Sequence, residues 1–312
     1  MKHLFVPLLL LIGLSAAAQQ SPAKFSLDVR YLLSLPDGYN ADSTRKWPLL
    51  IFLHGSGESG IDLDKVKVHG PPKLVEAGKK FPMIIVSPQS DFGGWDAGIL
   101  QRLILDLKTR YRVDADRVYM TGLSMGGFGT WEYASRFAGD LAAIVPICGG
   151  GRPEDAWKMR YVPTWCFHGG KDNVVLPSQS ADMINALKPY QPGVKFTVYP
   201  DAGHDSWTEA YNSDSLWTWL LAQRRHEFKP VPVAPATLAK YAGVYVRNGR
   251  DTVVITPAEN ALQLQAGRGK ETLKPASETV FYWMDKAPVD IIFNKEGFLF
   301  RGWQQEQYKK VK

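Results

Sequence analysis

Cysteine is scarce in this sequence, since 312 residues contain only Cys148 and Cys166. Both lie in apolar runs, AAIVPIC and PTWCFHG, where cysteine usually packs as a small hydrophobic residue. An exported chain could pair them, but this setting favours two free, buried thiols. No cysteine follows Ala18 closely, which argues against a lipid-anchored lipoprotein.

A long hydrophobic run is also missing. The apolar stretch from Leu4 to Leu14 is shorter than the roughly 20 residues that a membrane span needs. Lys2 precedes this stretch and Ala16-Ala17-Ala18 follows it, the pattern of a secretory signal peptide with an A-x-A cleavage site. We therefore expect a signal peptide over residues 1–18, cleavage after Ala18, no membrane span, and a periplasmic or secreted mature protein.

Several binding signatures are absent as well. The net charge of +6 comes from dispersed Lys and Arg, and no nucleic-acid motif accompanies it, so we expect no nucleic-acid partner. The chain lacks H-E-x-x-H and any Cys/His pair at finger spacing, which argues against a catalytic metal. It also lacks the two common glycine-rich nucleotide-binding motifs. The sequence therefore predicts no metal and no cofactor.

What is present is a regular alternation of apolar runs and amphipathic stretches up to about residue 228. Such alternation predicts a mostly parallel sheet covered by helices. The expected strands are 47–55, 81–89, 117–124, 141–149, 162–169 and 194–203, with an antiparallel edge strand within 25–35. The expected helices are 97–110, 126–137, 177–187 and 213–225.

The composition and the pattern of apolar residues change beyond residue 228. KPVPVAP, at 229–235, carries three prolines and reads as a semi-rigid linker. Short alternating runs separated by turn residues follow it, and they predict a small all-β unit of about six strands. We therefore expect a catalytic domain over 19–229, a proline-rich linker over 230–237 and a small β domain over 238–312.

One pentapeptide carries a chemical signature. Gly122-Leu123-Ser124-Met125-Gly126 fits G-x-S-x-G and lies between an expected strand and an expected helix. In that context the serine sits on a sharp turn with its hydroxyl exposed, which makes Ser124 the candidate nucleophile. A glycine-rich turn with an incidental serine is the plain alternative.

A serine nucleophile needs a base and an acid that orients it. His204 follows the last expected strand of the first domain, and Asp172 follows the strand before it. This chain order, Ser…Asp…His, is the one found in α/β-hydrolase folds. The developing oxyanion needs backbone donors, for which we expect the N–H groups of Met125 and of Ser56 in the glycine-rich loop LHGSGESG.

Residues 47–225 resemble secreted carboxylesterases of the α/β-hydrolase superfamily related to feruloyl esterases, acetylxylan esterases and prolyl-oligopeptidase-like peptidases. The matching stretches are LHGSGESG, the segment with Pro88, Gln89 and Trp95, DADRVYMTGLSMGGFGTWEYA, VPICGGG, FHGGKDNVV and GHDSWTEAY. The resemblance implies an α/β-hydrolase fold and the triad of Ser124, Asp172 and His204. Dienelactone hydrolases share the fold but use cysteine, and Ser124 argues against that chemistry.

These observations predict a carboxylic ester hydrolase, and the substrates we expect are acetyl or feruloyl esters of plant polysaccharide fragments. Trp95 and Trp207 flank the expected mouth, where they would either stack on sugar or aryl rings or belong to the core. Two alternatives remain open. One is a serine peptidase of prolyl-oligopeptidase-like type, and the other is a non-catalytic carbohydrate-binding protein on a hydrolase scaffold.

Overall fold

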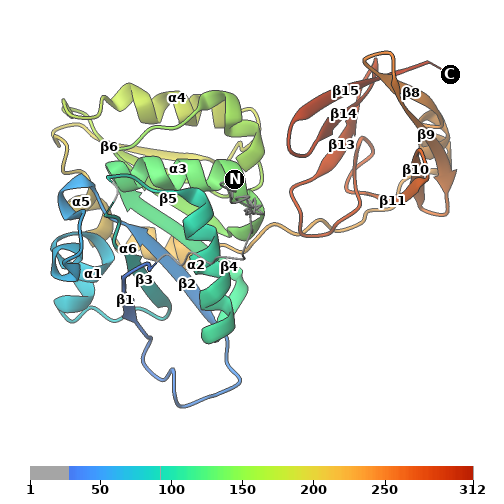
Figure 1. Ribbon diagram of the computed structural model, residues 1–312. Helices are drawn as coiled ribbons and strands as arrows, with labels where there is room; N and C mark the ends of the chain where they lie inside the picture. Colours follow the sequence, from blue (N-terminus) through green and yellow to red (C-terminus); the bar gives the residue numbers. More distant parts are fainter. Residues whose placement is uncertain (1–27, 92, 312) are drawn as a thin grey trace, which may run out of the picture.

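The computed structural model describes residues 28–91 and 93–311. They form an open sheet with helices on both faces, followed by a closed β-barrel that lies beside it (Figure 1). The signal peptide expected over residues 1–18 lies outside the described residues. No helix in the described ranges has both the length and the apolar character that crossing a membrane requires.

The sheet has seven strands in the order β1-β3-β2-β4-β5-β6-β7. Strand β1 pairs antiparallel with β3, and every other pairing is parallel. This arrangement confirms the expected α/β-hydrolase fold and the antiparallel edge strand. The strands are β1 (Tyr31–Ser34), β2 (Trp47–Leu53), β3 (Ile84–Pro88), β4 (Val113–Leu123), β5 (Ala143–Ile147), β6 (Trp165–Gly169) and β7 (Lys195–Tyr199).

Six α-helices accompany the sheet in the described part of the chain. They are α1 (Gly70–Glu76), α2 (Ala97–Arg110), α3 (Met125–Phe137), α4 (Pro177–Leu187), α5 (Trp207–Asn212) and α6 (Asp214–Ala222). Short 3₁₀ turns fill the connections: η1 (Ser56–Glu58), η2 (Leu63–Val68), η3 (Ala138–Asp140) and η4 (Pro153–Met159). The helix expected over 213–225 is shorter than predicted, because the backbone takes an extended conformation at Gln223 and the helix ends before it.

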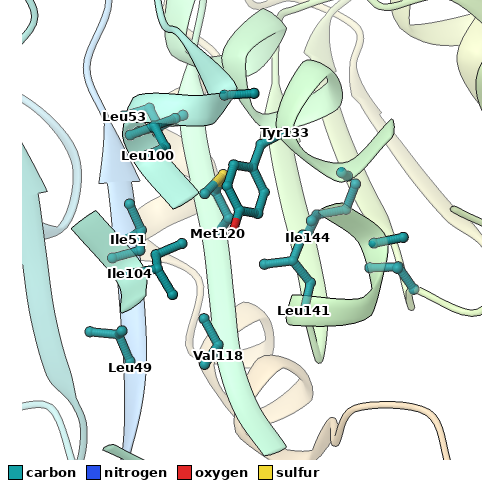
Figure 2. Packing of buried hydrophobic residues seen from close by; sticks show 14 of the residues in the cluster. Leu49, Ile51, Leu53, Leu100, Ile104, Val118, Met120, Tyr133, Leu141 and Ile144 are labelled. Atoms are coloured by element: carbon teal, nitrogen blue, oxygen red, sulfur yellow. The ribbon is translucent and has the colours of Figure 1, made fainter. Parts of the chain in front are cut away.

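The two faces of the sheet bury different side chains, as the two-residue period of a strand requires. On one face, Leu49 and Ile51 of β2 pack with Leu100 and Ile104 of α2 (Figure 2). On the other face, residues of the same strand pack against Trp217 and its neighbours on α5 and α6. Since both faces are covered, β2 is buried along its whole length. That burial explains why the sequence of β2 is continuously apolar and does not alternate between apolar and polar residues.

The second unit is a closed barrel of eight antiparallel strands rather than the expected six. Both strands that the sequence did not reveal, β11 and β15, are rich in polar residues, so their apolar alternation is weak. A short helix, α7 (Pro235–Lys240), precedes the barrel. The strands are β8 (Gly243–Arg247), β9 (Asp251–Ala258), β10 (Ala261–Ala266), β11 (Gly269–Pro275), β12 (Val280–Tyr282), β13 (Asp290–Phe293), β14 (Gly297–Arg301) and β15 (Gln305–Lys310).

A buried charge cluster joins the barrel to the first unit. Asp290, at the start of β13, has no exposed surface and lies 3.3 Å from Arg160 of the first unit and 2.7 Å from Arg301 of the barrel. The hydroxyl of Tyr161 donates to the same carboxylate at 2.5 Å. Phe228 adds a stacked contact with Tyr282, with ring centroids 4.5 Å apart. The two units therefore share a specific interface in addition to their linker.

Candidate active site

Ser124 stands on the sharp turn between β4 and α3. Its φ of 51° and ψ of −117° are strained for a residue with a side chain. The turn is possible because Gly122 and Gly126 lie against neighbouring backbone, where any Cβ would collide with carbonyl groups. The N–H of Ser124 donates to the carbonyl of Ile147 on β5 at 3.0 Å. The hydroxyl is thus held at the carboxyl end of the sheet, where sites of this fold form.

The three residues expected to form a triad are hydrogen-bonded in sequence. The Nε2 atom of His204 lies 2.9 Å from the hydroxyl oxygen of Ser124. Its Nδ1 atom lies 2.8 Å from Oδ2 of Asp172. Asp172 follows β6, and His204 follows β7, so the three side chains come from the ends of three strands. This geometry allows the imidazole to take the serine proton while the carboxylate orients the ring.

Asp172 is held as an anion by its surroundings. Burial raises the pKa of its carboxyl, but hydrogen bonds from His204, Val175 and Val174 outweigh burial and hold the pKa below its usual range. The two backbone N–H groups donate to Oδ1 at 2.9 and 3.0 Å. Oδ2 is thereby left facing the imidazole of His204, which is the arrangement an orienting acid needs.

A second histidine supports this carboxylate, and sequence reasoning gave it no role. His168 is fully buried on β6, and its Nε2 lies 2.9 Å from the carbonyl of Val175 and 3.3 Å from Oδ2 of Asp172. Its Nδ1 is 2.7 Å from the hydroxyl of Ser180 on α4. His168 therefore anchors the loop that carries Asp172. Its place four residues before Asp172, at the end of an apolar strand, was the available signal.

Both expected oxyanion donors begin a helical turn. Met125 is the first residue of α3 and Ser56 the first of η1. The first N–H groups of a helix have no partner within that helix, so they are free to face a negative oxygen. The neighbouring N–H of Gly55 is already engaged, because it donates to Oε2 of Glu58 at 2.9 Å.

The loop that carries Ser56 is fixed by side chains that sequence reasoning left without roles. His54 is buried, with Nδ1 donating to the carbonyl of Gly55 at 2.6 Å and Nε2 accepting from the N–H of Ser90 at 3.0 Å. Burial lowers the pKa of His54, which suits the neutral tautomer that these two bonds require. The side-chain amide of Gln89 donates to the carbonyl of Glu58 at 2.8 Å. The loop is thus pre-organised by the segment that follows β3.

Trp95 contacts both this loop and helix α3. Its Nε1 donates to the carbonyl of His54 at 3.1 Å, and its ring packs against Gly129 of α3. Trp95 also lines a cavity of about 420 Å³ together with Gln89, Ser90 and Leu100. No triad residue lines this cavity. A role for Trp95 in binding substrate stays a prediction.

Trp207 is only 9% exposed and stands at the edge of the triad. Its ring meets that of His204 edge-on, with centroids 5.3 Å apart. On its other side it contacts His69, whose Nδ1 accepts from the indole N–H at 3.3 Å. Trp207 therefore packs against the imidazole of His204, and little of its ring is left exposed for stacking on a substrate.

Cys148, Asp172 and His204 place possible ligand atoms within 4.8 Å of one another. Two of these atoms already share a hydrogen bond. Burial raises the pKa of the Cys148 thiol to about 12, so without a metal this thiol is protonated. The hydrogen bond between His204 and Asp172 accounts for two of the three groups without a metal. Cys148 and Cys166 are both free and buried, as expected.

Part of the chain resembles a known protein family, and the fold resembles a solved structure. The sequence pattern of the Dienelactone hydrolase family matches residues 95–215, less than half of the chain, and this stretch contains Ser124, Asp172 and His204. A crystal structure described as that of a thermostable esterase superposes with a TM-score of 0.56 at 28% identity, covering 64% of this chain and 60% of that chain.

Two curated relatives have esterase in their names. The bifunctional acetylxylan esterase/xylanase XynS20E of Neocallimastix patriciarum is 28% identical over 186 residues, which are 55% of this chain and 26% of that protein. A protein of Aspergillus terreus named "Probable feruloyl esterase C" is 26% identical over 126 residues, covering 38% of this chain and 46% of that one. The chain thus spans less than half the length of either relative.

Proposed function

We propose that this protein is a serine hydrolase that cleaves carboxylic esters through an acyl-enzyme. The observation that carries the proposal is the hydrogen-bonded series Ser124–His204–Asp172, at 2.9 and 2.8 Å, built on a strained elbow. The names of the relatives support the same class of reaction.

In this mechanism Nε2 of His204 takes the proton from Ser124 as the serine oxygen attacks the ester carbonyl. The N–H groups of Met125 and Ser56 stabilise the oxyanion, and the imidazolium then protonates the departing alcohol. Water, activated by the same imidazole, releases the acid and restores Ser124. Asp172 remains ionised throughout, which agrees with its lowered pKa.

The substrate we propose is an acetyl or feruloyl ester carried by a plant polysaccharide fragment. Relatives named for acetylxylan and feruloyl esters support this choice. The cavity of about 420 Å³ beside Trp95 adjoins the loop that carries Ser56, and its volume is sufficient for an aryl ring. Trp95 would then contact the acyl or sugar portion of the substrate.

The discriminating experiment compares p-nitrophenyl acetate, methyl ferulate and a peptide amide on the wild-type protein and on Ser124→Ala. We expect turnover of the two esters, a loss with Ser124→Ala, and fluorophosphonate labelling at Ser124 alone. Residual ester hydrolysis within about tenfold of wild type would remove Ser124 from this role.

Two other functions would show in the same assay. Turnover of the amide in preference to both esters would indicate a prolyl-oligopeptidase-like peptidase. No turnover of any substrate, together with no labelling, would indicate a non-catalytic carbohydrate-binding protein.

We also propose that the protein is exported, on the evidence of residues 1–18 alone. N-terminal sequencing of the protein recovered from a periplasmic or culture-medium fraction should then begin at Gln19. An N-terminus at Met1 in a cytoplasmic fraction would refute export.

A further inference from the structure

The barrel contains an apolar pocket that takes no part in the proposed hydrolysis. Its volume is about 210 Å³, and buried Leu273, Ile291 and Phe298 are among the residues that line it. An eight-stranded barrel is just wide enough either to be filled by side chains or to hold one small ligand. In this barrel part of the interior is left open.

The pocket lies at one end of the barrel because the other end is plugged. Leu238 of α7 is buried against the barrel core, and the nearby Tyr241 stacks on Phe293 with centroids 3.8 Å apart. Phe281 packs at right angles to Phe293 and completes the plug. These residues lie where β13 ends and the chain enters β8, so a ligand would enter at the opposite end, where Ala266 and Glu306 line the pocket.

The open end presents aromatic surface. Trp283 and Phe300 stack with centroids 5.9 Å apart, and Tyr308 stacks on Phe298 at 4.7 Å. Both pairs line the pocket. Trp303, on the turn between β14 and β15 at this end, is 85% exposed. Met284, which follows Trp283, is 46% exposed.

The charges near the pocket disfavour an anionic occupant. Its lining includes the carboxylates of Glu271 and Glu306. The guanidinium of Arg247, on the adjoining strand β8, is already paired with Glu306 and Asp251. A ligand carboxylate in the pocket would therefore lie beside the carboxylates of the lining, whereas a phenolic hydroxyl could donate to Glu271.

We propose that the barrel is a binding module for a small, uncharged, monocyclic phenol, whose ring enters the pocket between Leu264 and the stacked aromatic pairs. An apolar cavity of about 150 Å³ holds benzene in another protein, so the volume here suits one ring with a few substituent atoms. This site is separate from Ser124, and the inference does not depend on the proposed ester hydrolysis.

The test is calorimetric titration of the full chain with 4-methylphenol, cyclohexanol and 4-hydroxybenzoate. We expect one site for 4-methylphenol. Cyclohexanol should bind at least about tenfold more weakly because it has no aromatic face to stack, and 4-hydroxybenzoate because it carries a negative charge. Equal affinity for all three compounds, or no binding of 4-methylphenol, would overturn the proposal.

Matched variants locate the site on one strand. Val253 lines the pocket, whereas Val254, the next residue of β9, is 38% exposed on the outer surface. Val253→Phe should abolish the site by filling it, and Val254→Phe should leave it intact. Leu264→Phe, at a partly exposed position of the pocket, provides a second filling variant should Val253→Phe fail to fold. Undiminished binding in a folded filling variant would place the phenol elsewhere and refute the assignment.

Discussion

At the scale of single residues, the site depends on one strained serine. A side chain held at φ 51° costs about 1–3 kcal/mol, and the surrounding structure must offset that cost. It does so through the hydrogen bond from Ser124 to Ile147 and the close glycine contacts around the elbow. The strain presents the hydroxyl to His204 instead of burying it.

The assignment of His204 as the base can be tested by comparing its substitution with that of His226. His204→Ala should lower kcat/KM on p-nitrophenyl acetate by about 10⁴-fold or more, because it removes the ring nitrogen that lies 2.9 Å from the serine hydroxyl and would accept its proton. His226→Ala should leave the rate unchanged, since His226 stacks on Tyr161 at the junction with the barrel. A comparable loss of rate in both variants would contradict the assignment of His204.

The pH dependence of hydrolysis follows from the same pair of residues. The value of kcat/KM should rise with pH, because only a neutral imidazole can accept the proton. Asp172 stays ionised as the rate rises, since its pKa is lowered. The stabilising effect of its lowered pKa is present above about pH 4 and is lost as pH falls further. A flat profile from pH 5 to pH 8 would refute the proposed base.

At the scale of elements, the site is assembled at the carboxyl ends of four strands. Ser56 follows β2, Ser124 follows β4, Asp172 follows β6 and His204 follows β7. Parallel strands end at the same edge of a sheet, so residues up to 148 positions apart in the chain lie together. The connections are short loops braced by buried polar side chains such as His54 and His168.

Packing of α3 against β2 can be tested with two glycines. At Gly126 a Cβ would collide with the carbonyl of Leu53, whereas at Gly57 it would meet no atom within 4 Å. Gly126→Ala should therefore displace the start of α3, destabilise the protein by about 1–3 kcal/mol and lower ester turnover. Gly57→Ala serves as the control and should change neither property. Thermal unfolding and the p-nitrophenyl acetate assay measure both effects, and equal behaviour of the two variants would refute this packing.

At the scale of the whole molecule, the interface between the two units contains buried charge. Asp290 compensates Arg160, which is only 4% exposed, as well as Arg301. Asp290→Asn should lower the free energy of unfolding by about 3–5 kcal/mol, because it leaves buried guanidinium groups without a counter-charge. The control Asp285→Asn removes an exposed partner of Lys274 and should cost less than about 1 kcal/mol. Urea unfolding curves that coincide for the two variants would contradict this account.

A separate prediction is that the first unit alone carries out ester hydrolysis. All proposed catalytic groups precede Phe228 in the chain, so a chain that ends at Phe228 should keep its kcat on p-nitrophenyl acetate. It should also unfold at a lower temperature, because removing the barrel uncovers Tyr161 and Phe228. A folded truncation without activity on this small ester would show that the barrel completes the site.

Much of the first unit could be read from local sequence signals. The elbow GLSMG placed Ser124 between a strand and a helix, and the apolar runs located the core strands. Asp172 and His204 could be singled out because chain order in this fold restricts the candidates to residues after two particular strands. The barrel was harder, because GKETLKP and QEQYKK carry too few apolar residues to show a strand period. Six strands were therefore expected where eight close the barrel.

The sequence by itself determined the class of fold and the candidate triad, because both depend on short-range patterns of glycine, serine and apolar residues. Only the tertiary structure decided what His54, His168 and Trp207 do, since their partners lie on other elements and leave no local pattern. The same holds for the pocket in the barrel. Whether a closed sheet is filled or leaves room depends on how side chains from many strands meet inside it, and no single segment of the chain carries that information.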